Sequence, residues 1–479
     1  MTVRTTGAAD PSVTAGVPRP ATRYRERVSE LLGSGRRFAG LWVAPGGSSI
    51  RAQFVTPTGA TEVLTEPVRD GVVPTIVDLA PAANWDEREA HDLAGIRFAG
   101  HEPLRALLAH GPLAGWTVPV HGEDAYQVAV GPIHAGVIES GHFRFHLVGD
   151  RILHLDARLF YKHRGLERCA EGGDLAHGLA CVERACAACA VANGVAYALA
   201  AEQLLGLVPT AGLARVRTVL LELERVWNHL NDVAAICAGV GLAAGNNRFS
   251  ALTDRARRLN AVLSGHRFLF RTVEVGGSSL QAGGDQVRAL RVDLADLRRE
   301  AEVSWRELVF TTSFAARLPD VGVVDAGDVR RLGTVGPAAR AAGVLDDVRT
   351  GSPDLAYDGF EPVRPERAMG DVQARFEQRG LELWQSFDLL DQLLDRPLEP
   401  VRAERDAAPR ALGSGRVESP RGATGCVVEW DGERLRRVRL RTGSYANWPT
   451  VAFAAAGNLL PDFPLINKSF ELCYACADR

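Results

Sequence analysis

The sequence has little net charge, no long run of strongly apolar residues and few lysines. Its formal net charge is −3 over 479 residues, which excludes a general nucleic-acid-binding protein. The stretch richest in alanine, residues 185–207, is interrupted by Asn193, Glu202 and Gln203. It falls short of the roughly 20 strongly apolar residues that a membrane span requires, so we expect a buried helix there. Residues 1–20 are polar and lack an apolar core, so we expect a flexible tail rather than a secretory signal.

What is present is the composition of a soluble globular protein. Hydrophobic residues make up 46% of the chain and charged residues 24%, which are ordinary values. They exclude a disordered chain, a collagen-like chain and a bundle of membrane helices. At roughly 100–200 residues per domain, the length predicts several domains.

The N-terminal part of the sequence alternates between helical patterns and short β-type runs. A helical pattern covers residues 22–32 and ends at Gly33, and the first half of residues 85–108 also has helical character. Between these segments, turns rich in glycine and proline separate four expected strands at 38–43, 49–55, 61–65 and 72–77. Together they predict a small α+β domain of about a hundred residues.

The larger part of the chain is mainly helical, from about residue 179 to 398. The helical period is clearest in 213–236, 252–273, 287–308 and 381–394. A hairpin is expected on each side of this region, at 142–158 and at 426–441, each turning at a Gly-Asp or Asp-Gly pair. The predicted fold class is therefore α+β, with small β-hairpins attached to a mainly α-helical domain.

The cysteines give the strongest functional signal. Four of the eight form two Cys-x-x-Cys pairs, Cys186/Cys189 and Cys473/Cys476, and 284 positions separate the two pairs. On a helix, the spacing of Cys186 and Cys189 would place both sulfurs on one face, and two such pairs supply four soft ligands to a metal. Two alternatives stay open. One is a structural zinc site, although zinc-binding pairs usually lie about 15–20 residues apart, and the other is a set of buried, inert thiols.

Five motifs occur in a fixed order around these pairs: GPIHAGVIESGHFRFHL, LFYKHRGLE, ERACAACAVANGVAYALAAEQ, ESPRGATG and DFPLINKSFELCYACADR. They resemble the large subunit of nickel–iron hydrogenases, above all the energy-converting branch of the formate hydrogenlyase type, which is related to the 49-kDa subunit of respiratory complex I. The segment EREAHDLAGIRFAGHEPLRALL resembles the 30-kDa subunit of complex I. The resemblance implies a 30-kDa-like α+β domain at 21–115, fused to a mainly α-helical 49-kDa-like domain at 116–479.

The resemblance also implies a role for each matching residue. Cys186 and Cys473 match the terminal nickel ligands, and Cys189 and Cys476 match the thiolates that bridge nickel to iron. The iron of this family carries carbon monoxide and cyanide. Arg421, in ESPRG, matches an arginine beside the iron, where a guanidinium donates hydrogen bonds to cyanide. Without the four thiols, Arg421 would be interpreted as part of a surface salt bridge.

Two glutamates match further family positions. Glu139, in VIESGHF, matches a carboxylate that relays protons from a metal-bound thiolate, a task that requires a tuned pKa. Its alternative interpretation is a strand-edge carboxylate that faces water. Glu167, in HRGLE, matches a ligand of a magnesium ion beside the site, for which carboxylate oxygen is suitable. Its alternative is an ion pair with Arg164 or Arg168.

The chain departs from the family pattern around the ligands. Ala187-Ala188 stand between the first two cysteines instead of Gly-Ile, and Asn193 stands where a histidine is usual. Glu471-Leu472 replace Asp-Pro before Cys473, and Ser140 replaces a proline after Glu139. Changes next to metal ligands commonly cost about 10–100-fold in metal affinity or activity.

The function that the resemblance implies is the catalytic large subunit of a membrane-associated nickel–iron hydrogenase, evolving H₂ with a low-potential donor such as formate. The implied partners are an iron–sulfur small subunit, a ferredoxin-like subunit, antiporter-like membrane subunits and maturation chaperones, at the inner face of the cell membrane. We expect no iron–sulfur cluster in this chain, because the other four cysteines lack cluster spacing. One alternative is a complex-I-like quinone oxidoreductase subunit without a working nickel–iron centre, although the complex I relatives lack the four cysteines. The other is a zinc-stabilised scaffold.

Overall fold

The computed structural model of the chain describes residues 23–56, 59–111, 116, 118, 120, 122, 124–134 and 139–479. The expected flexible tail, residues 1–20, lies outside the described residues. The chain forms two compact units. The first comprises the residues up to Tyr161 together with 331–333 and 455–457, and the second comprises the remainder.

The first unit is an α+β arrangement whose described residues include three small sheets. Strands β1, β2 and β3 form an antiparallel sheet, β6, β7 and β8 form another, and β4 pairs with β5 in parallel. The bounds are α1 Arg23–Gly33, β1 Arg37–Val43, β2 Ser49–Val55, β3 Thr61–Pro67, β4 Val72–Pro74, η1 Pro81–Ala83, α2 Asn84–Ala94, β5 Arg97–Ala99, β6 Tyr126–Val130, β7 His142–Val148 and β8 Arg151–Arg158.

The alternation of side chains explains the core of the first sheet. On β2, Ile50, Ala52 and Phe54 are fully buried, as expected for a strand that turns one face to a core. Val28 and Leu31 of α1 belong to the same apolar cluster. The four strands and the helices predicted for this part are confirmed, although β4 ends at Pro74.

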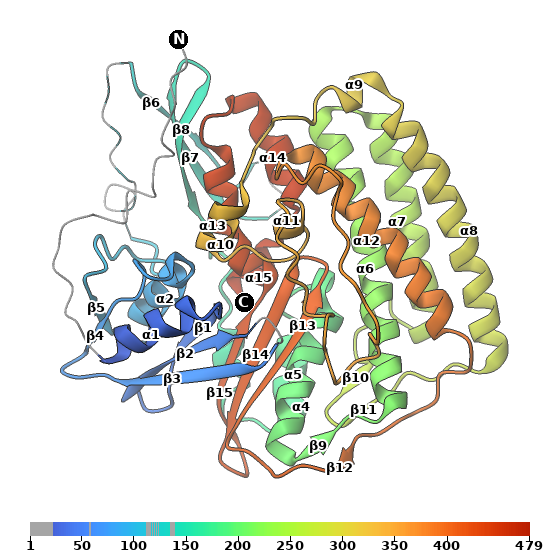
Figure 1. Cartoon of the computed structure of the whole chain (residues 1–479), viewed down its shortest axis with the longest axis horizontal. Coiled ribbons are helices and arrows are strands. Elements are labelled where there is room, and N and C mark those ends of the chain that lie inside the picture. Colours follow the sequence, from blue (N-terminus) through green and yellow to red (C-terminus); the bar gives the residue numbers. More distant parts are fainter. Residues whose placement is uncertain are drawn as a thin grey trace. The chain divides into compact units, whose positions relative to one another are not determined.

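The second unit contains a helical bundle and a three-stranded sheet, as Figure 1 shows. The bounds are α3 Leu166–Ala170, α4 Leu175–Glu183, η3 Ala187–Cys189, α5 Ala190–Leu205, β9 Leu207–Val208, α6 Ala211–Val240, α7 Ala243–Ser264, β10 Val273–Glu274, β11 Gly277–Ser278, α8 Gly284–Val309, α9 Thr312–Ala315, α10 Ala326–Leu332, α11 Pro337–Arg340, α12 Val372–Leu393, β12 Glu404–Arg405, β13 Leu412–Ser419, β14 Gly422–Trp430, β15 Leu435–Arg441, α13 Gly443–Ala455, η4 Leu460–Asp462, α14 Phe463–Phe470 and α15 Tyr474–Asp478.

Helices α6, α7, α8 and α12 lie side by side in the bundle (Figure 1). Each of the four helical periods predicted from the sequence corresponds to one of these helices, which confirms the four helices. The prediction that the second of them continues to residue 273 was wrong. The helix ends at Ser264 because Gly265 adopts a left-handed conformation, with φ 78°, and caps it.

The alanine-rich helix α5 packs against the antiparallel sheet β13–β14–β15. Gly413 and Gly415 of β13 permit this close approach, because a Cβ atom at Gly415 would lie 2.0 Å from the carbonyl oxygen of Ala196. Residues Ala187–Leu205 are apolar and long enough to cross a membrane, but 83% of that window is buried inside the fold. The expectation of a buried helix is thus confirmed.

Candidate metal centre

The two Cys-x-x-Cys pairs converge in the second unit. The Sγ atoms of Cys186, Cys473 and Cys476 lie within 4.8 Å of one another, and the Cys186 and Cys473 sulfurs are 3.0 Å apart. Cys189 belongs to the same buried cluster. Three sulfurs therefore lie within reach of one ion and the fourth cysteine packs beside them, which is a donor set that suits thiophilic transition metals.

In both pairs the first cysteine caps a short helix. Cys186 is the N-cap of the short 3₁₀ helix η3, and its sulfur accepts a hydrogen bond from the Ala188 amide at 3.1 Å. Cys473 is the N-cap of α15, and its sulfur accepts one from the Cys476 amide at 3.4 Å. The expectation that Cys186 and Cys189 share an α-helix was wrong, since α5 begins only after Cys189. The tight turn nevertheless directs both sulfurs to one place.

The four thiols share their protons unequally. Hydrogen bonds with Cys186 and Cys476 lower the pKa of Cys189 to about 6 in spite of its burial. The hydrogen bond with Cys186 is the main cause that raises the pKa of Cys473 and of Cys476. A thiolate at Cys189 is therefore held by neighbouring S–H groups, and a metal ion that binds here takes the place of those protons.

Arg421 is buried next to this cluster, in the two-residue turn between β13 and β14. It is 4% exposed and donates to Asp232 Oδ2 at 2.6 Å and to Asn228 Oδ1 at 3.2 Å. Its charge helps to lower the pKa of Cys189. Arg421 is thus a buried cation paired with Asp232, and the alternative of a surface salt bridge was wrong.

Asp232 connects Arg421 to a larger network of buried charges. Burial opposes ionisation of Asp232, but the guanidinium groups of Arg379 and Arg421 lower its pKa to about 2. His229 lies 3.4 Å from Asp232 and 3.3 Å from Glu382. Glu382 in turn pairs with Arg340 at 2.8 Å. Such a network keeps charged groups satisfied inside the bundle, where an unpaired charge would be costly.

Asn193 is a buried amide without a hydrogen bond, one helical turn after Cys189 on α5. Its side chain is fully buried, and neither amide atom has a partner among the described residues. Buried polar groups are almost always satisfied. Asn193 lies four residues after Cys189, so its unsatisfied side-chain amide fits a site in which a bound non-protein group supplies the missing hydrogen-bond partner. The sulfurs, Arg421 and Asn193 thus fit the centre that the resemblance implies.

Two further carboxylates lie near the cysteines, of which Glu224 is buried and Glu471 is partly buried. Glu224 accepts hydrogen bonds from the amides of Val191 and Ala192 at 2.7 and 3.1 Å, which places it at the start of α5, and burial raises its pKa to about 8. Glu471, which replaces the usual aspartate, accepts a hydrogen bond from Asn231 at 3.4 Å. Burial and the nearby Asp232 raise the pKa of Glu471 to about 7.

The two predicted glutamates have different surroundings. Glu139 is half-buried and belongs to the first unit, whereas the thiols belong to the second. Glu167 accepts hydrogen bonds from the Arg479 guanidinium at 2.9 Å and from the Leu440 amide at 2.8 Å, and Arg439 lies 3.5 Å away. Two cations therefore already neutralise this carboxylate, and a magnesium ion would have to compete with them.

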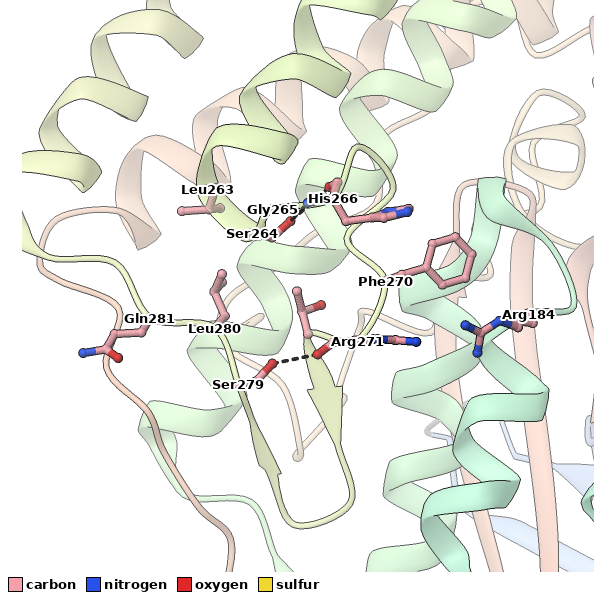
Figure 2. Close-up of a pocket in the computed structure, with 11 residues that line it drawn as sticks. Arg184, Leu263, Ser264, Gly265, His266, Phe270, Arg271, Ser279, Leu280 and Gln281 are labelled. Carbon is pink, nitrogen blue, oxygen red and sulfur yellow. Dashed lines mark hydrogen bonds between the residues drawn. The ribbon is translucent and has the colours of Figure 1, made fainter.

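A separate cavity of about 660 Å³ lies in the second unit, and none of the four clustered cysteines lines it. Figure 2 shows its lining side chains, which come from the end of α7, from the loop after it and from the segment after β11, with Arg184 contributed by another part of the chain. Arg184 precedes Cys186 by two residues, and Arg271 and His266 add further basic groups. The cavity is therefore lined by basic side chains, and one of them, Arg184, belongs to the segment that leads into the first cysteine pair.

The sequence alone did not single out Asp232, Asn228, Glu224, Arg379 or Glu382. All of them lie on α6 or α12, where charged residues with helical spacing are usually on a solvated face. The available signal was local: Asn228 and Asp232 follow Glu224 at intervals of four residues on one helix, so the three side chains share a face. Only the fold shows that this face is buried.

The chain is similar to several known proteins. Residues 247–411 and 401–479 match the family described as respiratory-chain NADH dehydrogenase, 49 Kd subunit, and residues 53–121 match the 30 Kd subunit. Formate hydrogenlyase subunit 5 of Escherichia coli is 29% identical over 85% of this chain and 77% of its own. The membrane-bound hydrogenase subunit alpha of Pyrococcus furiosus is 30% identical over 74% of this chain and 87% of its own.

Two other similar proteins are also subunits of oxidoreductases. An NADH-quinone oxidoreductase protein of Salinispora arenicola is 32% identical over 73% of this chain and 93% of its own. A chain of the archaeal membrane-bound sulfane sulfur reductase, a respiratory membrane complex, superposes with a TM-score of 0.69 at 26% identity, covering 76% of this chain and all of that one.

Proposed function

We propose that this chain is the catalytic large subunit of an energy-converting nickel–iron hydrogenase, because of the family to which it belongs. That family unites the respiratory 49-kDa subunit with the large subunits of formate-hydrogenlyase-type and membrane-bound hydrogenases. In this chain the 49-kDa-like part is fused to a 30-kDa-like part. The single observation that carries the proposal is that four cysteines from the middle and the end of the chain form one cluster, with the sulfurs of Cys186, Cys473 and Cys476 within 4.8 Å of one another.

In this proposal the four cysteines would hold the metals, Cys186 and Cys473 as ligands of nickel and Cys189 and Cys476 as ligands of both nickel and iron. When bound, the nickel–iron group with its carbon monoxide and cyanide ligands supplies the redox chemistry that interconverts protons and electrons with H₂. Arg421 is fixed by Asp232, and its remaining N–H donors would be available for hydrogen bonds to a cyanide nitrogen.

The burial of Arg421 and Asp232 determines their effect on the electrostatics of the site. Arg421 and Asp232 are at most 4% exposed, so the ion pair excludes water, and Asp232 holds the Arg421 guanidinium in place beside the cysteines. Preorganised charge in a dry site acts more strongly than in water. We propose Glu139 as the carboxylate that carries protons to and from this site, and Glu167 as the position of a magnesium ion once Arg479 moves aside.

The similar proteins are subunits of multi-subunit membrane complexes. We propose that this chain likewise binds an iron–sulfur small subunit, a ferredoxin-like subunit and antiporter-like membrane subunits, receives its metals from maturation chaperones, and lies at the membrane periphery. Its apolar helix of spanning length is buried. We also propose H₂ evolution from a low-potential donor such as formate, and domain limits at 21–115 and 116–479.

A second candidate function is a quinone-oxidoreductase-type subunit without a working nickel–iron centre. The observation that favours it is the changed surroundings of the ligands, with Asn193, Glu471 and Leu472 in place of the usual residues, together with 32% identity to an NADH-quinone oxidoreductase protein. The four retained cysteines favour the hydrogenase.

Elemental analysis of the complex purified from its producing host tests the proposal. One nickel and one iron per chain, together with infrared bands from carbon monoxide and cyanide, would support the hydrogenase, and Cys476→Ser should abolish both. A chain that is mature in its complex and contains neither nickel nor iron would refute the hydrogenase and favour the second candidate. Cys237→Ala, which changes a buried cysteine elsewhere on α6, is the matched control and should retain the metals.

A further inference from the structure

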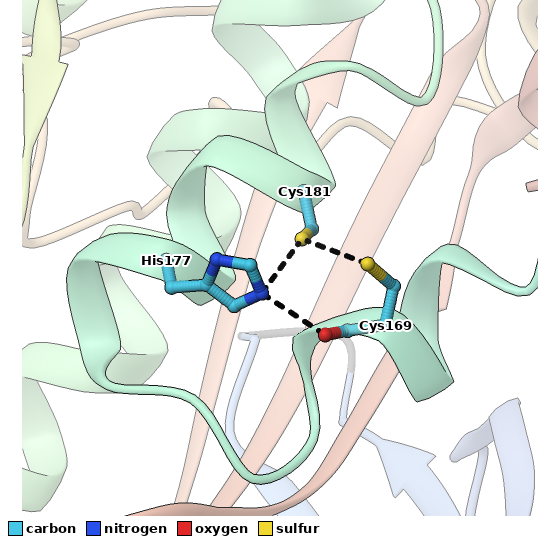
Figure 3. A group of neighbouring side chains, drawn as sticks. All are labelled: Cys169, His177 and Cys181. Carbon is cyan, nitrogen blue, oxygen red and sulfur yellow. Dashed lines mark hydrogen bonds between the residues drawn. The ribbon is translucent and has the colours of Figure 1, made fainter.

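A second group of metal-ligating side chains lies on α3 and α4, apart from the four clustered cysteines. Cys169 comes from α3, and His177 and Cys181 come from α4, one helical turn apart. Their three donor atoms lie within 4.8 Å of one another. Figure 3 shows the three side chains directed toward a common point.

The local structure fixes the histidine in this group. Asp174 caps α4, and its carboxylate accepts a hydrogen bond from the His177 amide at 2.7 Å, which sets the first turn of the helix. His177 then stands four residues before Cys181, so the two side chains lie on the same face. The Nε2 atom of the ring is the atom that faces both the Cys181 sulfur, at 3.6 Å, and the Cys169 carbonyl oxygen, at 3.0 Å.

The distances match a tetrahedral zinc site. With Zn–S of about 2.3 Å and Zn–N of about 2.0 Å, tetrahedral angles place two sulfurs about 3.8 Å apart and a sulfur and a nitrogen about 3.5 Å apart. The Cys169 and Cys181 sulfurs are 3.8 Å apart, and the Cys181 sulfur is 3.6 Å from His177 Nε2. Two of the three pairs of donors thus already stand at the separations that zinc imposes.

We propose that Cys169, His177 and Cys181 form a binding site for one zinc ion, with a fourth position open to water or to a donor from a partner subunit. Cys181 is buried, whereas Cys169 and His177 are exposed, so the ion reaches the site from solvent and keeps an open side. Two thiolates and an imidazole are a donor set of the kind that zinc prefers.

The proposed zinc site lies next to the segment that leads to the first cysteine pair, which suggests a structural role for the ion. The segment Arg184–Cys186 follows α4 directly, so an ion that ties α3 to α4 also fixes the chain that leads to the first cysteine pair. Binding replaces the hydrogen bond from His177 to the Cys169 carbonyl and the protons of both thiols, so zinc affinity rises with pH. The site does not depend on the proposed nickel–iron centre, because the two sets of ligands have no residue in common.

Zinc stoichiometry of the full-length chain, purified under reducing conditions in zinc-buffered medium, tests the proposal. The thiols of the candidate metal centre also bind zinc in an unmatured chain, so the measurement is made both in the wild type and in a Cys473→Ser background. In each background, Cys169→Ser and His177→Ala should lower the zinc content by one equivalent per chain. Both residues are exposed, so these variants are expected to fold.

Cys237→Ala, in which a buried cysteine outside both groups is changed, is the control and should lose no zinc. In the Cys473→Ser background, tetrahedral cobalt(II) spectra should lose thiolate-to-cobalt charge-transfer intensity after Cys169→Ser, whereas the contribution of the three thiols that remain in the candidate metal centre should be the same before and after. Equal zinc content in Cys169→Ser, His177→Ala and the control would overturn the proposal. A disulfide between Cys169 and Cys181 in the reduced, zinc-treated protein would overturn it as well.

Discussion

The Sγ atoms of Cys186 and Cys473 lie 3.0 Å apart although the two residues are separated by 287 positions. Each sulfur caps a short helix, η3 or α15, so each is positioned by its own backbone. Their meeting therefore depends on the tertiary packing that brings the end of the chain against the start of α5. The candidate metal centre is complete only after the last helix of the chain is in place.

Gly415→Ala should destabilise the chain by about 1–3 kcal/mol, because the new Cβ would press on the Ala196 carbonyl oxygen, 2.0 Å away. Gly425→Ala is the matched control. It lies on the neighbouring strand, where the nearest atom to a new Cβ is 3.7 Å away, and it should change stability little. Thermal unfolding of the three proteins measures the difference. Equal unfolding temperatures would show that β13 has room to move away from α5.

Asp232→Asn should cost about 3–5 kcal/mol, because it leaves the buried guanidinium groups of Arg379 and Arg421 without their anion. Glu300→Gln is the comparison, since it removes the exposed partner of Arg255 and should cost less than about 1 kcal/mol. Denaturant titrations of both variants give the two values. A loss at Asp232 no larger than that at Glu300 would mean that water or another anion reaches the pair.

Local sequence patterns predict part of this fold, whereas features that depend on contacts between distant residues, such as those of Gly415 and Asp232, are not predictable from them. The first sheet and the long helices follow from local periodicity, and the sequence predicts them. Strand β13 was missed because Gly413 and Gly415 are poor strand formers, and only the close approach of α5 explains them. The clustered cysteines were predicted, but Asp232 was not, because its partners Arg379 and Arg421 are 147 and 189 positions away and no local pattern pairs them.

Glu139→Gln should leave the metal content unchanged and slow proton exchange at the proposed hydrogenase centre, because the amide keeps the shape of the carboxylate but does not titrate in the working range. The measurement is deuterium exchange into H₂ by the purified complex. Glu433→Gln, in the exposed turn between β14 and β15, is the control and should exchange at the wild-type rate. Exchange at the wild-type rate in Glu139→Gln would exclude this residue as the relay.

The stability of the first unit should depend on acid through Asp156. Burial opposes its ionisation, but the hydrogen bond with His154 and the charge of Arg105 lower its pKa to about 2, whereas an unfolded aspartate titrates near 3.9. A depressed pKa stabilises the fold above the unfolded value, and the contribution, about 2 kcal/mol, disappears as the pH falls from about 4 to about 2.

Asp156→Asn should therefore lower the unfolding temperature relative to the wild type at pH 6, and the gap should narrow at pH 3. Asp150→Asn, in the exposed turn of the same hairpin, should show no such dependence on pH. A gap between wild type and Asp156→Asn that is constant from pH 6 to pH 3 would contradict the assignment of the stabilisation to the ionised carboxylate.

Two buried asparagines of the candidate metal centre allow a test of whether the unpaired amide serves the metal. Asn228 donates to the carbonyl oxygens of Ala188 and Glu224, both at 2.8 Å, whereas Asn193 has no partner for either amide atom among the described residues. In the metal-free chain, Asn228→Ala should cost about 1–3 kcal/mol, because it strands buried acceptors. Asn193→Ala should cost less than about 1 kcal/mol, since the loss of packing is offset by removal of an unsatisfied amide.

In the matured complex the order of the two asparagine variants should differ. If Asn193 contacts the bound group, Asn193→Ala should lower nickel content about 10–100-fold at equal loading conditions without a matching loss of stability. Denaturation of the metal-free chain and nickel analysis of the complex separate the two effects. A stability loss at Asn193 equal to that at Asn228, with full nickel content, would show that the amide is only part of the core.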